Sequence, residues 1–164
     1  MTYDLRAKDM PTMLARLGEI FQGNQQAILF MQDIKFISHV WDDLVDGDKP
    51  VSRETVSAAF EKAMIGVNLN PFFVANRAML LPVMLNASLL WHGANELEKT
   101  GSRHAQEVAH VIRCAPGDLA LMCAAIIGGT AHAKKHAAEL RMMMQQDCLD
   151  DYLTDLEASH ELAA

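Results

Sequence analysis

The chain has 164 residues, of which 51% are apolar and 6% aromatic, with 11 methionines and a formal net charge of −7. A chain of this length can bury a core without metal or disulfide staples, so we expect one domain over residues 1–164. The acidic balance argues against a general nucleic-acid binder and against binding to anionic membranes, because both depend on lysine and arginine to neutralise phosphate.

The three cysteines are Cys114, Cys123 and Cys148, an odd number without paired spacing. This pattern fits a reducing compartment better than a secreted disulfide framework, and we expect the three thiols in the core. The N-terminus lacks the basic and then apolar run of a signal peptide. We therefore expect a cytoplasmic protein.

The most apolar stretch runs from Met79 to Trp91, and Pro82 and Asn86 interrupt it. It falls short of the roughly 18 or more consecutive apolar residues of a transmembrane helix. We expect a buried core helix here, and no membrane span anywhere in the chain.

Apolar residues recur three and four positions apart along nearly the whole chain, which predicts an all-α protein. The first expected helix begins at Pro11 or Thr12 and ends near Gly23. The second runs from about Asn24 to Asp46, and the glycine and proline of residues 47–50 end it.

Ser52 could cap a third helix that runs to about Asn68, with apolar residues at positions 60, 64 and 67. Asn70 precedes a fourth, which carries Pro71 in its first turn and runs to Glu98 or Lys99. We expect this helix to bend near Pro82.

Residues 100–102, Thr-Gly-Ser, separate the two halves of the chain. The remaining helices are expected over residues 103–113, 116–127 and 130–157. The segment 116–129 has almost no polar face, so it belongs at the centre of a bundle or in a subunit interface. The whole pattern predicts an all-α, single-domain helical bundle of about six to eight helices that forms a homo-oligomer through apolar helix faces.

The strongest chemical signal is a run of carboxylates where the second helix ends. Asp42 and Asp46 lie one turn apart on one helix face, and Asp43 points about 100° away. The helix dipole disfavours acidic groups there by about 0.3–1 kcal/mol each, and a bound cation would offset that cost. Carboxylates at this spacing suit Mg²⁺. The alternative is a solvated turn in which the aspartates bond local amides.

Residues 42–48, Asp-Asp-Leu-Val-Asp-Gly-Asp, resemble the first aspartate-rich motif, Asp-Asp-x-x-Asp, of the class I isoprenoid synthases. These prenyl diphosphate and terpenoid synthases are all-helical. The resemblance implies that Asp42 and Asp46 bind Mg²⁺ that holds a diphosphate, with Asp43 in support. Family members are about twice as long, so the chain would be a shortened, isoprenoid-synthase-like bundle. Trp41 stands where the prenyltransferases usually have histidine.

A second aspartate-rich segment contains Asp150-Asp151-Tyr152-Leu153 and is similar to the opening of the second motif of the same family. Thr154 stands where the last aspartate of that motif would be. Asp150 and Asp151 are therefore secondary metal candidates, and the alternative is a solvated face of a terminal helix.

Two cations are candidates for binding a phosphorylated ligand. Arg77 interrupts an apolar run, so its charge either reaches solvent or faces a polar cavity. Lys35 lies on the same helical face as Asp42 and could pair with a carboxylate, bind a phosphate or remain a surface lysine.

His132, His136 and Glu139 could meet one Zn²⁺ on a single helix face. The pair of histidines has lysines between its members instead of a catalytic glutamate. We expect a solvated helix face here.

Two function classes remain open. The first is a non-catalytic assembly or accessory protein that keeps a shortened isoprenoid-synthase-like bundle and a residual metal site. The second is a Mg²⁺-dependent enzyme, or a binder, acting on a diphosphate-bearing, partly apolar ligand. We favour the first because the chain is short and lacks the arginines that follow the first motif in prenyltransferases.

Overall fold

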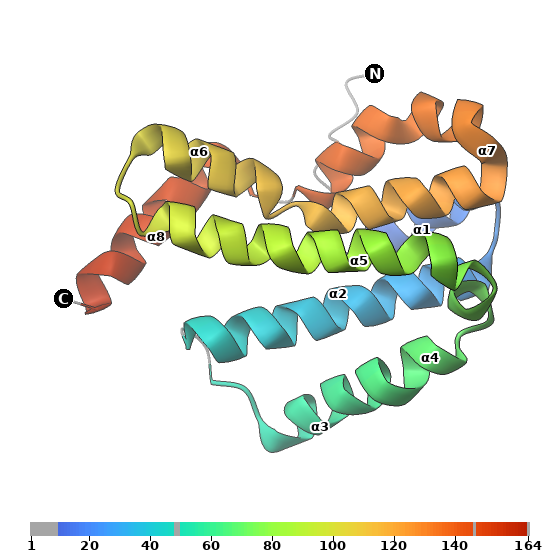
Figure 1. The fold of residues 1–164 in the computed structure, drawn as a ribbon, viewed down its shortest axis with the longest axis horizontal. Coiled ribbons are helices and arrows are strands. Elements are labelled where there is room, and N and C mark those ends of the chain that lie inside the picture. The colour runs from blue at the N-terminus through green and yellow to red at the C-terminus, as the bar shows by residue number, and fades with distance from the viewer. Residues whose placement is uncertain (1–9, 48–49, 146, 164) are drawn as a thin grey trace.

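The computed structural model describes residues 10–47, 50–145 and 147–163, but not the side chains of residues 10, 46 and 159–163. Every regular element in these ranges is helical, which confirms the all-α prediction (Figure 1). In chain order the elements are α1 (Met10–Ile20), α2 (Gln25–Asp46), α3 (Arg53–Glu61), the π-helix η1 (Lys62–Gly66), α4 (Val67–Leu69), α5 (Pro71–Glu98), α6 (Arg103–Ile112), α7 (Ala115–Met144) and α8 (Leu149–Ala163).

Polar caps fix the starts of four helices. The side chains of Asn24, Ser52, Asn70 and Ser102 each accept a hydrogen bond from a backbone N–H in the first turn that follows. Asn70 is the most buried of them, and its Nδ2 also donates to the carbonyl of Gln26 at 2.9 Å. This cap joins the start of α5 to α2, because one side chain bonds both.

Helix α5 leaves helical geometry at Asn76, which the sequence did not predict, while Pro82, where a bend was expected, lies inside the helix. Asn76 has φ −119° and ψ 16°, and its Nδ2 donates to the carbonyl of Phe72 at 2.8 Å. The side-chain amide thus supplies the hydrogen bond that the backbone would make in a regular helix. The chain can leave helical geometry there without leaving that carbonyl unbonded.

Helix α7 turns sharply at Gly129 and then doubles back beside its own first half (Figure 1). Gly129 has φ 80° and ψ 173°, a backbone region that is essentially restricted to glycine. The predicted helices 116–127 and from 130 onward correspond to these two halves. The second half ends at Met144, and α8 begins separately at Leu149, where the sequence predicted one continuous helix.

The core lies between α1, α2, α5 and α7. Phe30 of α2 has no exposed surface, and its ring stacks on that of Phe73 with 5.5 Å between centroids. Leu119 and Cys123 of α7 are also fully buried. The apolar first half of α7 is therefore central, as predicted.

The cysteines only partly follow the prediction. Cys114 and Cys123 are buried, and burial raises the pKa of the Cys123 thiol to about 12, so this thiol stays protonated. Cys148 is only half-buried, just before α8, where its Sγ accepts a hydrogen bond from the backbone N–H of Asp151.

Helix α5 is not the buried core helix that the sequence predicted. Leu80 is fully buried, but Leu81, Leu85 and Leu89 are 45%, 61% and 61% exposed. By length and composition alone, α5 and an apolar window of the segment Arg103–Ala158 could cross a membrane. The absence of a membrane span stays a prediction.

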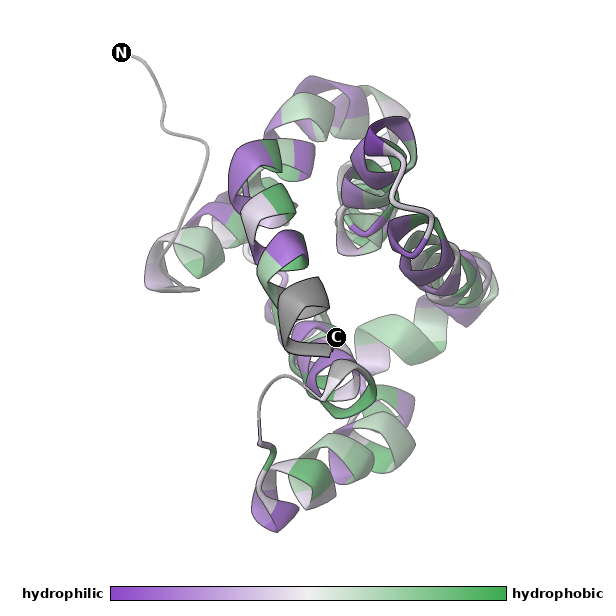
Figure 2. Ribbon diagram, turned by 90° about the vertical axis from the view of Figure 1, so that its left-hand side faces the viewer, coloured by the Kyte–Doolittle hydropathy of each residue, from purple (hydrophilic) through white to green (hydrophobic). Residues whose placement is uncertain are grey.

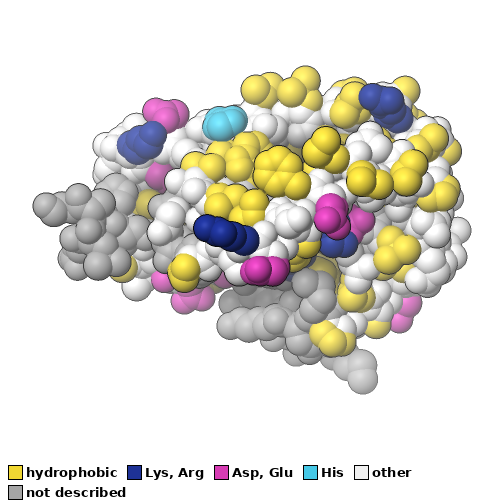
Figure 3. Space-filling model, turned by 90° about the horizontal axis from the view of Figure 1, so that it is seen from below, with side chains coloured by type: hydrophobic (Ala, Val, Ile, Leu, Met, Phe, Trp, Pro, Cys, Tyr) yellow, Lys and Arg dark blue, Asp and Glu magenta, His cyan; other side chains and the backbone are white. Residues whose placement is uncertain are grey.

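A second apolar surface covers α3, η1 and α4. Phe60 and Met64 are 62% and 70% exposed, and of the predicted apolar triplet only Val67 is buried. The wider π turn over Lys62–Gly66 changes the rotation between these positions, so they do not share one inward face. Figure 2 shows apolar residues along this lowest part of the fold, and Figure 3 shows apolar side chains gathered on the underside.

Candidate functional site

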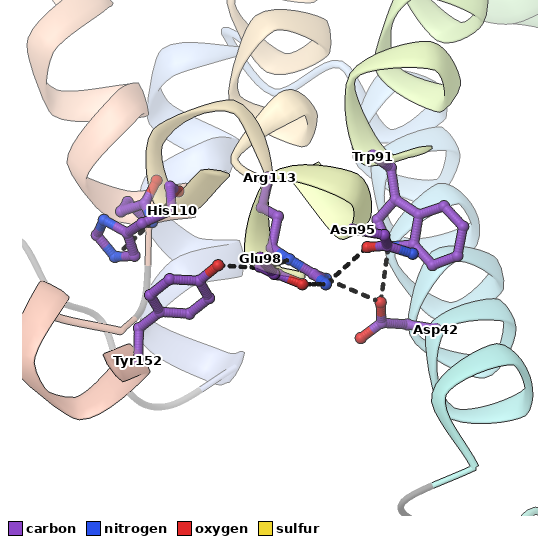
Figure 4. Close-up of polar contacts among 8 residues, drawn as sticks. Asp42, Trp91, Asn95, Glu98, His110, Arg113 and Tyr152 are labelled. Atoms are coloured by element: carbon purple, nitrogen blue, oxygen red, sulfur yellow. Dashed lines mark hydrogen bonds and ion pairs between the residues drawn. The ribbon is translucent and has the colours of Figure 1, made fainter. Parts of the chain in front are cut away.

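Arg113 is the centre of a polar network between four helical segments (Figure 4). Its Nε and Nη2 donate to Oε1 and Oε2 of Glu98 at 2.5 and 2.8 Å. Such a bidentate pair fixes both the distance and the plane of the guanidinium. Nη2 also donates to Oδ1 of Asn95 at 2.7 Å.

Asp42 joins α2 to this network. Its Oδ1 accepts from Arg113 Nη1 at 3.2 Å and from the indole Nε1 of Trp91 at 2.7 Å. The Trp91 ring also packs against that of Trp41, with 4.7 Å between the centroids. From α8, the hydroxyl of Tyr152 donates to Oε1 of Glu98.

Burial and charge fix the protonation of two members. Burial alone would lower the pKa of Arg113, but its hydrogen bonds and ion pairs with Glu98 and Asp42 raise the pKa above its ordinary value. The pKa of Tyr152 is also raised, first by burial and then by its bond to Glu98. At neutral pH the guanidinium is charged and the phenol neutral, which suits a fixed tie between helices better than proton transfer.

Local structure explains why these residues meet. Glu98 ends α5, and a tight turn that includes Gly101 at φ 67° follows it. Capped by Ser102, α6 then runs back beside α5 (Figure 1). Arg113 is the first residue after α6, and its long side chain reaches the end of α5.

The predicted metal ligands lie in different surroundings. Asp42 lies in the network described above, and Asp43 is half-buried on α2. The side chain of Asp46 lies outside the described residues. Asp150 and Asp151 are exposed in the first turn of α8. Among the side chains that the structure describes, which exclude that of Asp46, no group of three or more His, Cys, Asp or Glu is arranged to hold a metal ion.

The two predicted phosphate-binding cations lie on different elements. Lys35 is half-buried on α2, with its Nζ 3.9 Å from Sδ of Met13 on α1, and burial lowers its pKa. Arg77 is exposed on α5, beside a shallow depression lined by Ala78 and Leu81. No described hydrogen bond or ion pair connects either cation with Asp42.

The prediction of a solvated helix face around His132 is wrong. His132 is half-buried and its Nε2 lies 2.8 Å from the carbonyl oxygen of Ile20 on α1. His136 Nδ1 lies 3.2 Å from Glu139 Oε2, and Arg16 also bonds this carboxylate. The bond to Arg16 lowers the pKa of Glu139. These residues connect α7 to α1.

Sequence reasoning identified Asp42 but missed the other members of the network: Trp91, Asn95, Glu98, Arg113 and Tyr152. One signal was available, since Arg113 is a lone cation between the apolar residues Val-Ile and Cys-Ala. A charge in such surroundings needs a buried partner or a route to solvent. The local pattern does not say which carboxylate supplies that partner.

Comparison of the chain with protein-family models, with curated proteins and with solved structures found no significant match. The resemblance of residues 42–48 to an aspartate-rich motif stays a prediction.

Proposed function

We propose that this chain is a non-catalytic helical subunit that assembles through apolar helix faces. The observation that carries this proposal is the outer face of α5, where Leu81, Leu85 and Leu89 are all about half exposed or more. Fully burying a leucine side chain contributes about 1.5–3 kcal/mol, so an apolar partner for this face would be strongly favoured. Contiguous exposed apolar surface is typical of interaction sites.

The polar network supports a structural role for the residues around Asp42. In the described part of the chain, every buried side-chain nitrogen or oxygen atom has a hydrogen-bond partner. The guanidinium of Arg113 donates from Nε to Glu98, from Nη2 to Asn95 and from Nη1 to Asp42. An anionic ligand would have to displace these protein groups, because the guanidinium is already engaged.

The alternative is a Mg²⁺-dependent enzyme or binder of a diphosphate-bearing ligand on a shortened isoprenoid-synthase-like bundle. Two observations favour it. The described bonds of the Asp42 carboxylate are all made by Oδ1, and its side chain is 42% exposed. Asp43 stands next to it and is only half-buried. A hydrated Mg²⁺ could approach such carboxylates from solvent.

Thermal unfolding separates the two functions. We expect the midpoint of the wild-type protein to stay unchanged when Mg²⁺ and inorganic diphosphate are added together. A ligand at a hundred times its dissociation constant would add about 2.7 kcal/mol and raise the midpoint. A rise that Asp43→Asn abolishes would support the enzyme or binder instead.

Light scattering tests assembly directly, and we expect a mass above that of one chain.

A further inference from the structure

We infer that the outer face of α5 binds the same face of a second copy of this chain, with the two helices antiparallel and Leu85 at the twofold axis. This inference rests on the proposed assembly function and specifies its partner. It follows from the spacing of the exposed residues, from the charges at the ends of the stripe and from the charges on the neighbouring helix.

Five of the exposed residues of α5 form a stripe, which we call the α5 stripe: Ala78, Leu81, Leu85, Leu89 and His92. Their spacing of three and four places them on one helix face. The spacing of the stripe is symmetric about Leu85: Leu81 and Leu89 match each other four residues away on either side, while Ala78 and His92, seven residues away, differ. A twofold contact needs such a self-complementary surface, because each residue meets its counterpart in reverse order.

The ends of the stripe carry opposite charges. Arg77 is exposed near its N-terminal end, and Glu96 is exposed near its C-terminal end. An antiparallel pair brings each Arg77 toward the partner's opposite charge, whereas a parallel pair would place like charges together. Antiparallel packing also opposes the helix dipoles. Glu96 bonds Lys99 of its own chain at 2.7 Å, but an exposed pair of this kind is weak and can rearrange.

A bilayer is a poorer partner for this face than a second copy. Helix α2 runs beside α5 (Figure 1), and the two are in contact. Along its length α2 carries Asp33, Lys35 and Asp42. If α5 crossed a membrane in this fold, these charged groups would be carried toward the hydrocarbon, where they are strongly disfavoured. A protein surface leaves α2 in water.

Sedimentation velocity tests the partner and the surface together. We expect a dimer for the wild type and a monomer for Leu85→Glu, with a dissociation constant raised at least a hundredfold. The matched control is Leu69→Glu, because Leu69 is 73% exposed but lies on α4, outside the stripe. It should remain dimeric. Circular dichroism checks that both variants fold. We expect them to fold because both substituted positions are exposed.

Other sedimentation results would overturn the inference in distinguishable ways. A dimer that survives Leu85→Glu but dissociates in Leu69→Glu would place the contact on α4, so the assembly function would stand and the α5 contact would not. A monomeric wild type would overturn both. Flotation with neutral phosphatidylcholine vesicles tests membrane binding. If the wild type binds the vesicles and Leu85→Glu does not, the α5 stripe binds a membrane and not a second copy.

A charge exchange tests the antiparallel orientation. Arg77→Glu should weaken the dimer about tenfold, which corresponds to about 1.4 kcal/mol, because it places two acidic groups near each other at both ends of the contact. Adding Glu96→Arg to this variant should restore the dissociation constant to within about threefold of the wild type. A double variant no tighter than Arg77→Glu alone would overturn the antiparallel arrangement.

Discussion

The two sides of α5 differ in how completely this chain covers them. On the inner side Trp91, Asn95 and Glu98 each bond a residue from another part of the fold. On the outer side Leu85 and Leu89 lie 61% exposed. In the described residues, the buried side-chain nitrogen and oxygen atoms therefore all have hydrogen-bond partners, whereas the outer side of α5 leaves apolar surface exposed. This difference is the basis on which we propose an apolar partner for α5.

The physical costs of the two situations explain the difference. A buried polar group without a hydrogen-bond partner costs free energy in every folded molecule, so it needs that partner before any association takes place. An exposed leucine is common on protein surfaces and does not prevent folding. Apolar surface can therefore be left for association, while buried charge cannot.

The largest expected effect comes from removing the centre of the inner side. Arg113→Ala leaves the carboxylates of Glu98 and Asp42 without their cation, so we expect a loss of about 3–5 kcal/mol in the free energy of unfolding. Urea denaturation measures it, with the exposed Arg53→Ala as the control that changes by less than about 0.5 kcal/mol. A loss below 1 kcal/mol would show that the network does not stabilise the fold.

Gly129→Ala tests the sharp turn inside α7, a helix that contacts α5. The backbone geometry of φ 80° and ψ 173° is strained for alanine. We therefore expect a loss of about 1–3 kcal/mol in the free energy of unfolding. The exposed neighbour substitution Thr130→Ala should change stability by less than about 0.5 kcal/mol in the same thermal scan. Equal midpoints for the two variants would count against a strained turn.

Tyr152→Phe removes one donor from Glu98 but leaves the Arg113 pair intact. We expect a loss of about 1.5 kcal/mol at neutral pH, the size of a hydrogen bond to a charged group. Because the pKa of Tyr152 is raised in the folded protein, this stabilisation is complete below the unfolded pKa of about 10 and declines as pH rises further. Urea denaturation at pH 8 and pH 11 measures the difference in the free energy of unfolding between the wild type and Tyr152→Phe. This difference should be smaller at pH 11 than at pH 8. A constant difference would contradict the contact.

The smallest expected effect is on the outer side. Leu85→Ala should change the free energy of unfolding by less than about 0.5 kcal/mol when both proteins are dilute enough to be monomeric. Leu80→Ala, which truncates the fully buried leucine on the inner side of the same helix, should cost about 2–5 kcal/mol. Similar losses for the two variants would mean that the outer side is covered within one chain.

Local features predicted much of the helical pattern. The caps Asn24, Ser52, Asn70 and Ser102 mark helix starts because each satisfies backbone donors within a few residues along the chain. The bend at Asn76 was not predicted, because it depends on a side-chain bond to the Phe72 carbonyl that competes with the regular helix.

The site could be predicted only in part, because its partners are distant in the sequence. The crowded carboxylates at the end of α2 predicted a metal site, whereas the side chain that the structure places 3.2 Å from Asp42 is the guanidinium of Arg113, which the sequence did not predict. Periodicity identifies an apolar face such as that of Leu85, but it does not distinguish burial inside the chain from burial against a partner. The Mg²⁺ site stays a prediction.

The most direct test of assembly through α5 is the thermal unfolding midpoint measured at increasing protein concentration. Association through the folded state makes the midpoint rise with concentration. We expect such a rise for the wild type and a constant midpoint for Leu85→Glu. A wild-type midpoint that does not change with concentration, or an equal rise in both proteins, would contradict assembly through α5.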